Sequence, residues 1–413
     1  MAPTDDPAAG SLEFMLLAEI LGEDMTIMRI GSIKVENFKS LIGFNLRLAK
    51  FSCLIGLNGS GKSTVLQFLD FMGRQVRGDV EGWLKQREWK ASDVLSKFTS
   101  RRNVEFVATI LNDTGSLIAI WKAGYNTSHM NCTVESIVMS DVKLIVTGGE
   151  YNTSVKDGNS WKDEKRKIEF RYQGSILSQL RDDILPPNLV HIKRFIRNLH
   201  SLDMLTPDYL RQRTRQAGGS LGLGGQQLSS FIRELSTRDR AQLIVDLQKA
   251  YPRLLRIIPK SLRGGWTQLE TIESFESGPM RTESRHLNDG MLRLIAILAE
   301  LSTEHKVILF DEIENGVNPE LVDYLVTRLI KARQQVVVTT HSPLILNYLE
   351  DDIAREGVIY LYKTPQGHTQ SIPFFTIPSV AEKLAVMGPG EAFVDTSLDK
   401  LEKEIASMPQ RGQ

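Results

Sequence analysis

A glycine-rich stretch at positions 56–64 constrains the fold of this 413-residue chain more than any other feature. It reads Gly-Leu-Asn-Gly-Ser-Gly-Lys-Ser-Thr and matches the full pattern G-x-x-x-x-G-K-[ST]. The apolar run at 51–55 predicts a buried strand before it, and residues 65–69 predict a helix after it. The glycines let successive backbone N–H groups point at one anion, and the helix N-terminus adds partial positive charge. The stretch therefore predicts a phosphate-binding loop.

The residue types in this loop predict a nucleotide bound together with a metal ion. Lys62 would reach the β- and γ-phosphates, and the hydroxyl of Ser63 would bind Mg²⁺. A chance glycine turn is the alternative, but every fixed position of the pattern is present in the expected context. We expect ATP as the nucleotide, with further contacts from Asn58, Gly59, Ser60, Gly61 and Thr64.

Two later predicted strands are followed by side chains that can bind a metal ion or transfer a proton. An apolar run at 307–310 is followed by Asp311 and Glu312, and a second at 335–339 is followed shortly by His341. Ligands bind at the carboxyl ends of strands in open α/β sheets. We expect Asp311 to hold Mg²⁺ through water, Glu312 to act as the general base for the attacking water, and His341 to sense the γ-phosphate. The residues between them predict a crossover helix.

A second anion-binding surface is predicted where a later apolar helix begins. The segment Leu287–Gly290 opens this helix, and it places the polar Asn288 beside Gly290 at the N-terminus. Within one subunit we expect this surface to lie too far from the glycine loop to share its nucleotide. The expected use is therefore in trans, against ATP held by a partner subunit.

Together these pieces resemble the ABC-type ATPases in order and spacing. The opening Ile33–Ser40 resembles the soluble RecF/SMC branch, and Thr340–Pro343 with the large insert resembles AAA ATPases related to OLD-type defence proteins. The resemblance spans about residues 28–350. Asn288 stands where the family has its signature serine. The family's glutamine that bridges Mg²⁺ and water has no unambiguous match, and the candidates are Gln173 and Gln179.

The resemblance implies an α/β fold: a P-loop ABC-type ATPase head with an antiparallel β lobe and a helical insert. Short strand-like runs predict the antiparallel lobe, and helical patterns predict the insert. The expected divisions are a tail at 1–27, the head at 28–350 with the lobe at 104–172 and the insert at 175–286, and a strand/helix extension at 351–413.

Composition adds little about partners. The 50 basic and 50 acidic residues give a formal net charge of zero, so any nucleic-acid surface must be local. Basic clusters at 74–102 and 193–215 could contact DNA, or they could be solvated helix faces or dock an acidic protein. The two cysteines form no disulfide framework, which suits a cytoplasmic location. No run is long and apolar enough to cross a bilayer, so no membrane contact is expected.

The motifs, with the family that they resemble, imply Mg²⁺-dependent ATP hydrolysis by a head dimer, or a higher oligomer, that gates a DNA-directed or anti-phage defence assembly. A TOPRIM-type nuclease follows the ATPase in many OLD-type proteins, but the roughly 60 residues after Leu349 carry no such acidic cluster. We therefore expect a separate effector chain, such as a nuclease. The alternatives are the nucleotide-binding subunit of a membrane transporter and an ATP-locked scaffold with little turnover.

Overall fold

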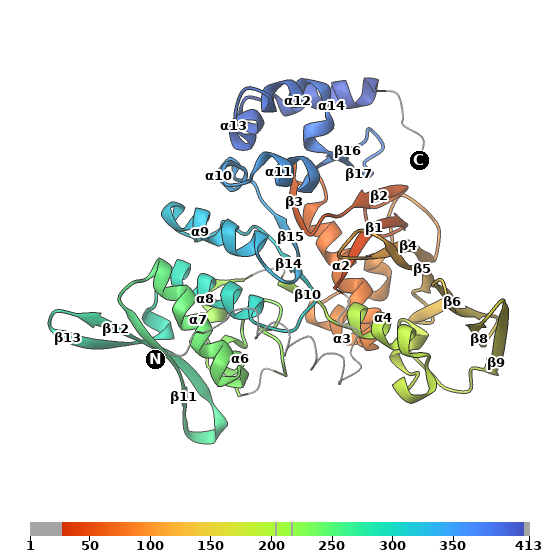
Figure 1. Cartoon of the computed structure of the whole chain (residues 1–413), viewed down its shortest axis with the longest axis horizontal. Helices are drawn as coiled ribbons and strands as arrows, with labels where there is room; N and C mark the ends of the chain where they lie inside the picture. The colour runs from red at the N-terminus through yellow and green to blue at the C-terminus, as the bar shows by residue number, and fades with distance from the viewer. Residues whose placement is uncertain (1–26, 203–204, 216–217, 409–413) are drawn as a thin grey trace, which may run out of the picture.

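The computed structural model describes residues 27–202, 205–215 and 218–408 (Figure 1). The expected tail at 1–27 lies outside the described residues except for Ile27. Three β-sheets and the helices between them make up the described chain, which confirms the mixed α/β class. None of the helices in the described ranges is long and apolar enough to span a membrane.

The main sheet carries the glycine loop. Its order is β10-β14-β15-β3-β16-β17, in which the first five strands run parallel and β17 runs antiparallel at one edge. The strands are β3 (Phe51–Ile55), β10 (Leu199–Leu202), β14 (Val307–Phe310), β15 (Gln335–Thr339), β16 (Val358–Lys363) and β17 (Thr369–Pro373).

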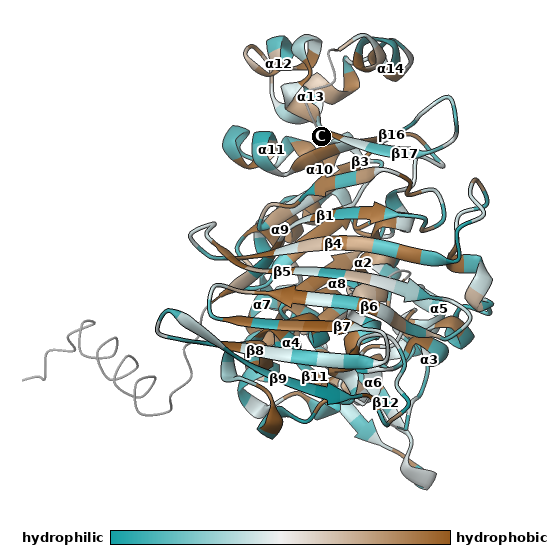
Figure 2. Ribbon diagram, turned by 90° about the vertical axis from the view of Figure 1, so that its right-hand side faces the viewer, coloured by the Kyte–Doolittle hydropathy of each residue, from teal (hydrophilic) through white to brown (hydrophobic). Residues whose placement is uncertain are grey.

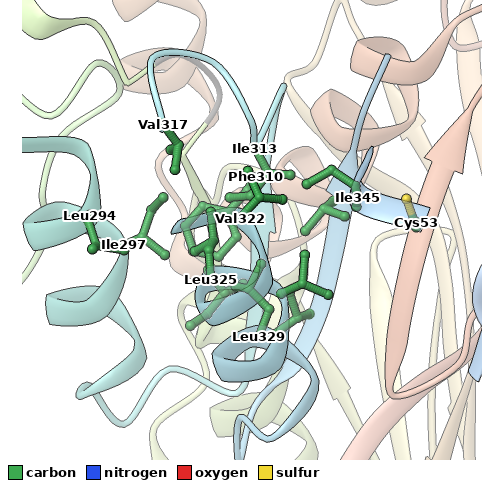
Figure 3. Close-up of a cluster of buried hydrophobic side chains, with 14 of the residues drawn as sticks. Cys53, Leu294, Ile297, Phe310, Ile313, Val317, Val322, Leu325, Leu329 and Ile345 are labelled. Carbon is green, nitrogen blue, oxygen red and sulfur yellow. The ribbon is translucent and has the colours of Figure 1, made fainter. Parts of the chain in front are cut away.

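Both faces of the main sheet are covered, which explains why its strands are continuous apolar runs. In β14, Val307 and Leu309 join the core formed with α2 (Lys62–Arg77), whereas Ile308 and Phe310 join the core on the opposite face. That second core includes α8 (Asp289–Leu301) and α9 (Pro319–Ile330), whose apolar side chains pack beside Phe310 (Figure 3).

An antiparallel sheet of eight strands packs on the α2 side, in the order β2-β1-β4-β5-β6-β7-β8-β9 (Figure 2). It confirms the expected antiparallel region, but β1 and β2 from the start of the head belong to the same sheet. The strands are β1 (Met28–Glu36), β2 (Phe44–Arg47), β4 (Asn103–Asn112), β5 (Leu117–Asn126), β6 (Asn131–Val138), β7 (Val142–Thr147), β8 (Glu150–Asp157) and β9 (Ser160–Lys167).

The expected helical insert at 175–286 is only partly helical. Its helices are α4 (Pro187–Arg197), α5 (Pro207–Leu210), α6 (Leu228–Glu234) and α7 (Thr237–Ala250). The prediction of helix is wrong for the small sheet that follows, made of β11 (Leu254–Ser261), β12 (Thr267–Phe275) and β13 (Gly278–Glu283). A short apolar run such as that of β11 has no period that distinguishes strand from helix. Its Pro259 is tolerated because β11 is an edge strand.

The expected boundary at residue 350 is also wrong, because β16 pairs directly with β3 and therefore lies inside the main sheet. Strand pairing is a long-range contact that the order of motifs along the chain does not reveal. The remaining helices are α3 (Val80–Gln86), α10 (Pro343–Asn347), α11 (Asp351–Gly357), α12 (Pro378–Leu384), α13 (Pro389–Val394) and α14 (Leu398–Ser407). The last three lie at the end of the molecule opposite the small sheet (Figure 1).

Candidate functional site

The strand order brings the separate motifs to one edge of the main sheet. β14, β15 and β3 are parallel neighbours, so the segments that follow them leave the sheet at the same edge. Asp311 and Glu312, the acid pair, follow β14. His341 follows β15, and the glycine loop follows β3. Backbone hydrogen bonds fix these segments: Thr340 N–H donates to Leu54 O at 3.2 Å, and Ile313 N–H donates to Thr339 O at 3.2 Å.

The glycine loop has the backbone geometry of an anion cradle. Gly59 and Gly61 have φ values of 78° and 111°, which favour glycine. α2 begins at Lys62 and receives no side-chain cap from Gly61, so its first N–H groups have no intrahelical acceptor. Within the described part of the chain, the buried Oγ of Ser60 has no hydrogen-bond partner. These donors fit the phosphates of a nucleotide.

Lys62 lies buried across this loop. Its Nζ donates to Gly56 O at 2.9 Å and to Leu57 O at 3.1 Å. Burial lowers the pKa of Lys62, and the carboxylates of Asp311 and Glu312 act in the opposite direction. The lysine therefore lies within electrostatic reach of Asp311 and Glu312. The hydroxyl of the exposed Ser63 and the carboxylate of Asp311 are oxygen donors that suit Mg²⁺.

Thr369 on β17 holds the glycine loop through a side-chain hydrogen bond. The sequence gives no signal of this role. Its Oγ1 donates to Ser60 O at 2.9 Å and lies 2.8 Å from the hydroxyl of Ser40. A Cβ added to Gly61 would lie 2.3 Å from the same Oγ1. The close approach of β17 therefore requires glycine at position 61, in addition to the requirement set by its positive φ.

A buried threonine at the end of β15 positions the acid pair. The hydroxyl of Thr339 donates to Asp311 Oδ1 and accepts the backbone N–H of Glu312 at 2.8 Å. Glu312 adopts a φ of 47°, which is uncommon for a residue with a side chain. Thr339 is fully buried, and sequence reasoning overlooked it although it stands two residues before His341.

The next acidic residue, Glu314, positions the histidine segment. Its Oε1 accepts the backbone N–H of His341 at 2.8 Å, which ties the segments after β14 and β15 together. The side chain of His341 is exposed at the sheet edge. It is therefore accessible to a ligand that spans the glycine loop and the acid pair.

The segment Leu287–Gly290, which stands where the family has its signature, lies at the start of α8 and has contacts within its own chain. The side chain of Asn288 caps the helix by accepting Met291 N–H at 2.7 Å. A Cβ added to Gly290 would lie 2.8 Å from Gly316 O, so the helix start packs closely on the loop after the acids. Arg211 donates to Leu287 O at 2.9 Å and also pairs with Asp289, which holds this segment in place.

Arg293, one turn further along α8, links the signature to the acidic loop. Its guanidinium donates to Asn315 O, and only 7% of the residue is exposed. Burial lowers the pKa of Arg293, while Glu312 and Glu314 oppose this shift. The signature helix and the loop after the acid pair therefore form one connected unit in the same subunit.

The expected metal role of Gln173 is wrong in this structure. Its Nε2 donates to Glu81 Oε2 at 3.0 Å, beyond the C-terminal end of α2. The 16 residues of α2 separate that end from Lys62 by about 24 Å, at 1.5 Å per residue. The alternative, Gln179, lies near Gly78 at the same distant end. Position along the chain gave no information on which end of α2 these glutamines reach.

Several of the basic residues proposed for DNA contact have partners inside the molecule. In the first cluster, Arg74 and Arg87 pair with the buried Asp70, and Trp83 is fully buried. In the second cluster, Lys193 pairs with Asp182 and Arg211 serves the signature segment. Other members of the two clusters are exposed, among them Lys85, Arg102, Arg197, Arg213 and Arg215. The guanidinium of Arg215 lies 4.8 Å from the ring centroid of Trp266.

Comparison with protein families identifies two segments of the chain. Residues 28–170 match the model described as "AAA ATPase domain", and residues 277–347 match "AAA domain, putative AbiEii toxin, Type IV TA system". The first segment contains the glycine loop, and the second contains the signature, the acid pair and His341. No curated protein gives a significant match to the chain.

Similar solved structures include three heads of SMC proteins. The SmcHead bound to the C-winged helix domain of ScpA is 16% identical, with 83% of this chain and 96% of that chain covered and a TM-score of 0.43. The SMC head domain from Thermotoga maritima is 9% identical, with 84% of this chain and 98% of that chain covered and a TM-score of 0.41. The Smc head with an extended coiled coil, bound to the C-terminal domain of ScpA derived from Pyrococcus furiosus, is 14% identical, with 87% and 100% covered and a TM-score of 0.48.

Proposed function

Since this protein is an ATPase built from AAA-type domain segments, we propose that it belongs to the RecF/SMC/OLD-like branch and hydrolyses ATP with Mg²⁺ at the edge of the main sheet. One observation carries this proposal: the parallel neighbours β14, β15 and β3 place the acid pair, His341 and the glycine loop beside one another. The carboxylates act on Lys62 electrostatically, which supports a single shared site.

Each residue has a role that follows from its position. Lys62 and the first N–H groups of α2 would bind the phosphates, while Ser63 and Asp311 would hold Mg²⁺. The bound Mg²⁺ would neutralise charge on the phosphate oxygens. Glu312 would accept a proton from the attacking water, and His341 would contact the γ-phosphate. Thr339 and Glu314 would hold these groups in position.

The substitution Glu312→Gln tests the catalytic assignment. It keeps the shape of the side chain but removes the base, so ATP turnover should fall by about 10²–10⁴-fold while ATP affinity is retained. Glu320→Gln is a matched control, because Glu320 is exposed in the first turn of α9 and lies outside the site. Near-parental turnover of Glu312→Gln would remove Glu312 from the role of base.

We propose further that two heads associate through ATP, with Asn288 and Gly290 of one subunit facing the nucleotide of the other. Asn288 is exposed at the N-terminus of α8, where a helix favours an anion. Sedimentation of Glu312→Gln should therefore show dimers, or larger oligomers, with Mg·ATP. An identical monomer with and without Mg·ATP would contradict the trans arrangement.

Dimer closure would gate a separate effector, such as a TOPRIM-type nuclease, in a cytoplasmic defence assembly. ATP-dependent closure can order or release a partner when the two states bind it with different affinity. The matched family description concerns toxin–antitoxin proteins, which is consistent with a defence role. The test is to purify the tagged parent and the tagged Glu312→Gln variant from the host with Mg·ATP. Both should carry the same effector, and the variant should carry more of it.

DNA contact is proposed only for the exposed Arg213 and Arg215 near Trp266. If these arginines contact phosphates, duplex binding should weaken steeply with salt, and replacing both by alanine should make that dependence shallower. Equal salt dependence in the parent and the double variant would exclude this surface. ATP turnover provides the control, because neither arginine belongs to the nucleotide site.

A further inference from the structure

Three side chains of types that bind metals lie close together, far from the glycine loop and the acid pair. His200 lies on the edge strand β10, Glu300 lies in the last turn of α8, and His305 lies in the connection between α8 and β14. β10 and β14 are parallel, and His200 and His305 stand near their amino ends. The cluster therefore lies at the amino ends of these strands, whereas the glycine loop lies at the carboxyl end of β3. None of its members serves the proposed ATP site.

The geometry of the cluster is compact. One nitrogen from each histidine and one carboxylate oxygen all lie within 4.8 Å of one another. His305 Nδ1 contacts Glu300 Oε1, and His200 Nε2 lies 4.0 Å from the same oxygen. The two imidazole rings stack with centroids 4.5 Å apart and planes 11° from parallel, so one ring would have to turn for both nitrogens to point at one ion. We propose that these three side chains bind a divalent transition-metal ion, with Zn²⁺ as the best fit.

The burial of Glu300 supports a cation at this position. Its side chain is 0% exposed, and its Oε2 has no hydrogen-bond partner among the described residues. A buried carboxylate is costly unless it is paired and its oxygens are satisfied. Arg77 is close enough to act on Glu300 electrostatically, but its Nε donates to Arg197 O at 2.8 Å. The hydroxyl of Ser220 lies 3.5 Å from His200 Nε2. An N–H at His305 Nδ1 would satisfy Oε1, but Oε2 of Glu300 would still have no partner among the described residues.

The donor set indicates the kind of metal and its role. Two imidazole nitrogens and one carboxylate oxygen are typical ligands of Zn²⁺, and water can complete a tetrahedral shell. The side chain of His200 is only 4% exposed and that of His305 is 17% exposed, so a bound ion would be largely shielded from solvent. A metal here clamps the edge strand β10 to the C-terminal end of α8. This is the helix whose N-terminus carries the signature.

Zinc binding by the tag-free, full-length protein tests the site. After removal of metal with a chelator and dialysis against Zn²⁺, the parent should hold about one zinc per chain, and its melting temperature should rise with zinc concentration. Glu300→Gln and His305→Asn should lose the bound zinc and the thermal shift. His129→Asn is the matched control, since His129 is an exposed histidine on the antiparallel sheet side and should retain both.

X-ray absorption at the zinc edge keeps the test decisive if a variant does not fold. Nitrogen and oxygen coordination with two imidazole ligands in the parent would support the site, whereas a shell of sulfur or of water alone would overturn it. The proposal also fails if the parent retains no zinc after dialysis. Equal zinc content in the parent and in a folded His305→Asn variant would have the same consequence.

Discussion

Replacing Thr339 by valine removes the hydroxyl that positions the acid pair and keeps the size of the side chain. Thr339 is fully buried; its hydroxyl donates to Asp311 and accepts Glu312 N–H. A hydrogen bond to a charged group contributes about 1.5–3 kcal/mol and a neutral one about 0.5–1.5 kcal/mol. We therefore expect Thr339→Val to lower the free energy of unfolding by about 2–4 kcal/mol, because valine leaves buried polar groups without a partner.

The same substitution should reduce ATP turnover. If about 1.4–2.8 kcal/mol of the lost interaction acts on the placement of Asp311 and Glu312 in the transition state, turnover falls about 10–100-fold. The assay is steady-state hydrolysis at a temperature where urea unfolding shows the variant to be folded, with ATP affinity measured in parallel. Thr339→Ser retains the hydroxyl and should recover most of the turnover. Turnover of the folded valine variant within about twofold of the parent would refute the positioning role of Thr339.

Two further substitutions test the packing and the electrostatics. In Gly290→Ala the new Cβ would lie 2.8 Å from Gly316 O, so turnover should fall about tenfold with little change in ATP affinity; parental turnover would show that the contact relaxes freely. Burial raises the pKa of Asp70, but Arg74 and Arg87 outweigh it and hold the pKa below its usual value. This stabilisation is complete above the unfolded pKa of about 3.9 and is lost as the pH falls through the lower folded pKa. Asp70→Asn should therefore lower the free energy of unfolding at neutral pH by about 3–5 kcal/mol, and the difference should shrink in acid; an equal difference at both pH values in urea titrations would contradict this.

The amino-acid sequence by itself determined the nucleotide loop and the strand-end residues. Gly56–Thr64 is one contiguous segment whose geometry depends on its own glycines and on the helix that follows. Asp311, Glu312 and His341 could be predicted because each follows a buried strand, and such strands appear as apolar runs. These features are local, and the physical interactions that create them operate over a few residues.

Only the tertiary structure decided what supports those residues. Thr369 reaches the glycine loop because β16 and β17 join the main sheet, although they lie some 300 residues further along the chain. Gln173 has a suitable side chain but lies at the wrong end of α2, where it bonds with Glu81. Strand pairing and helix packing are set by contacts between distant segments, and a residue's type does not report them.

The difference between local and long-range contacts also explains why the sequence indicated the Mg²⁺ ligands but not the proposed zinc ligands. Ser63 and Asp311 could be assigned to Mg²⁺ from their motifs, whereas His200, Glu300 and His305 belong to no motif and are brought together by the pairing of β10 with β14 and the end of α8. In the sequence His200 stands 100 residues before Glu300, in a segment of mixed polar and apolar residues that matches no metal-binding motif. A local pattern can specify which chemical groups a segment offers, but the fold determines which of those groups meet, because only the packed chain sets the distances between them.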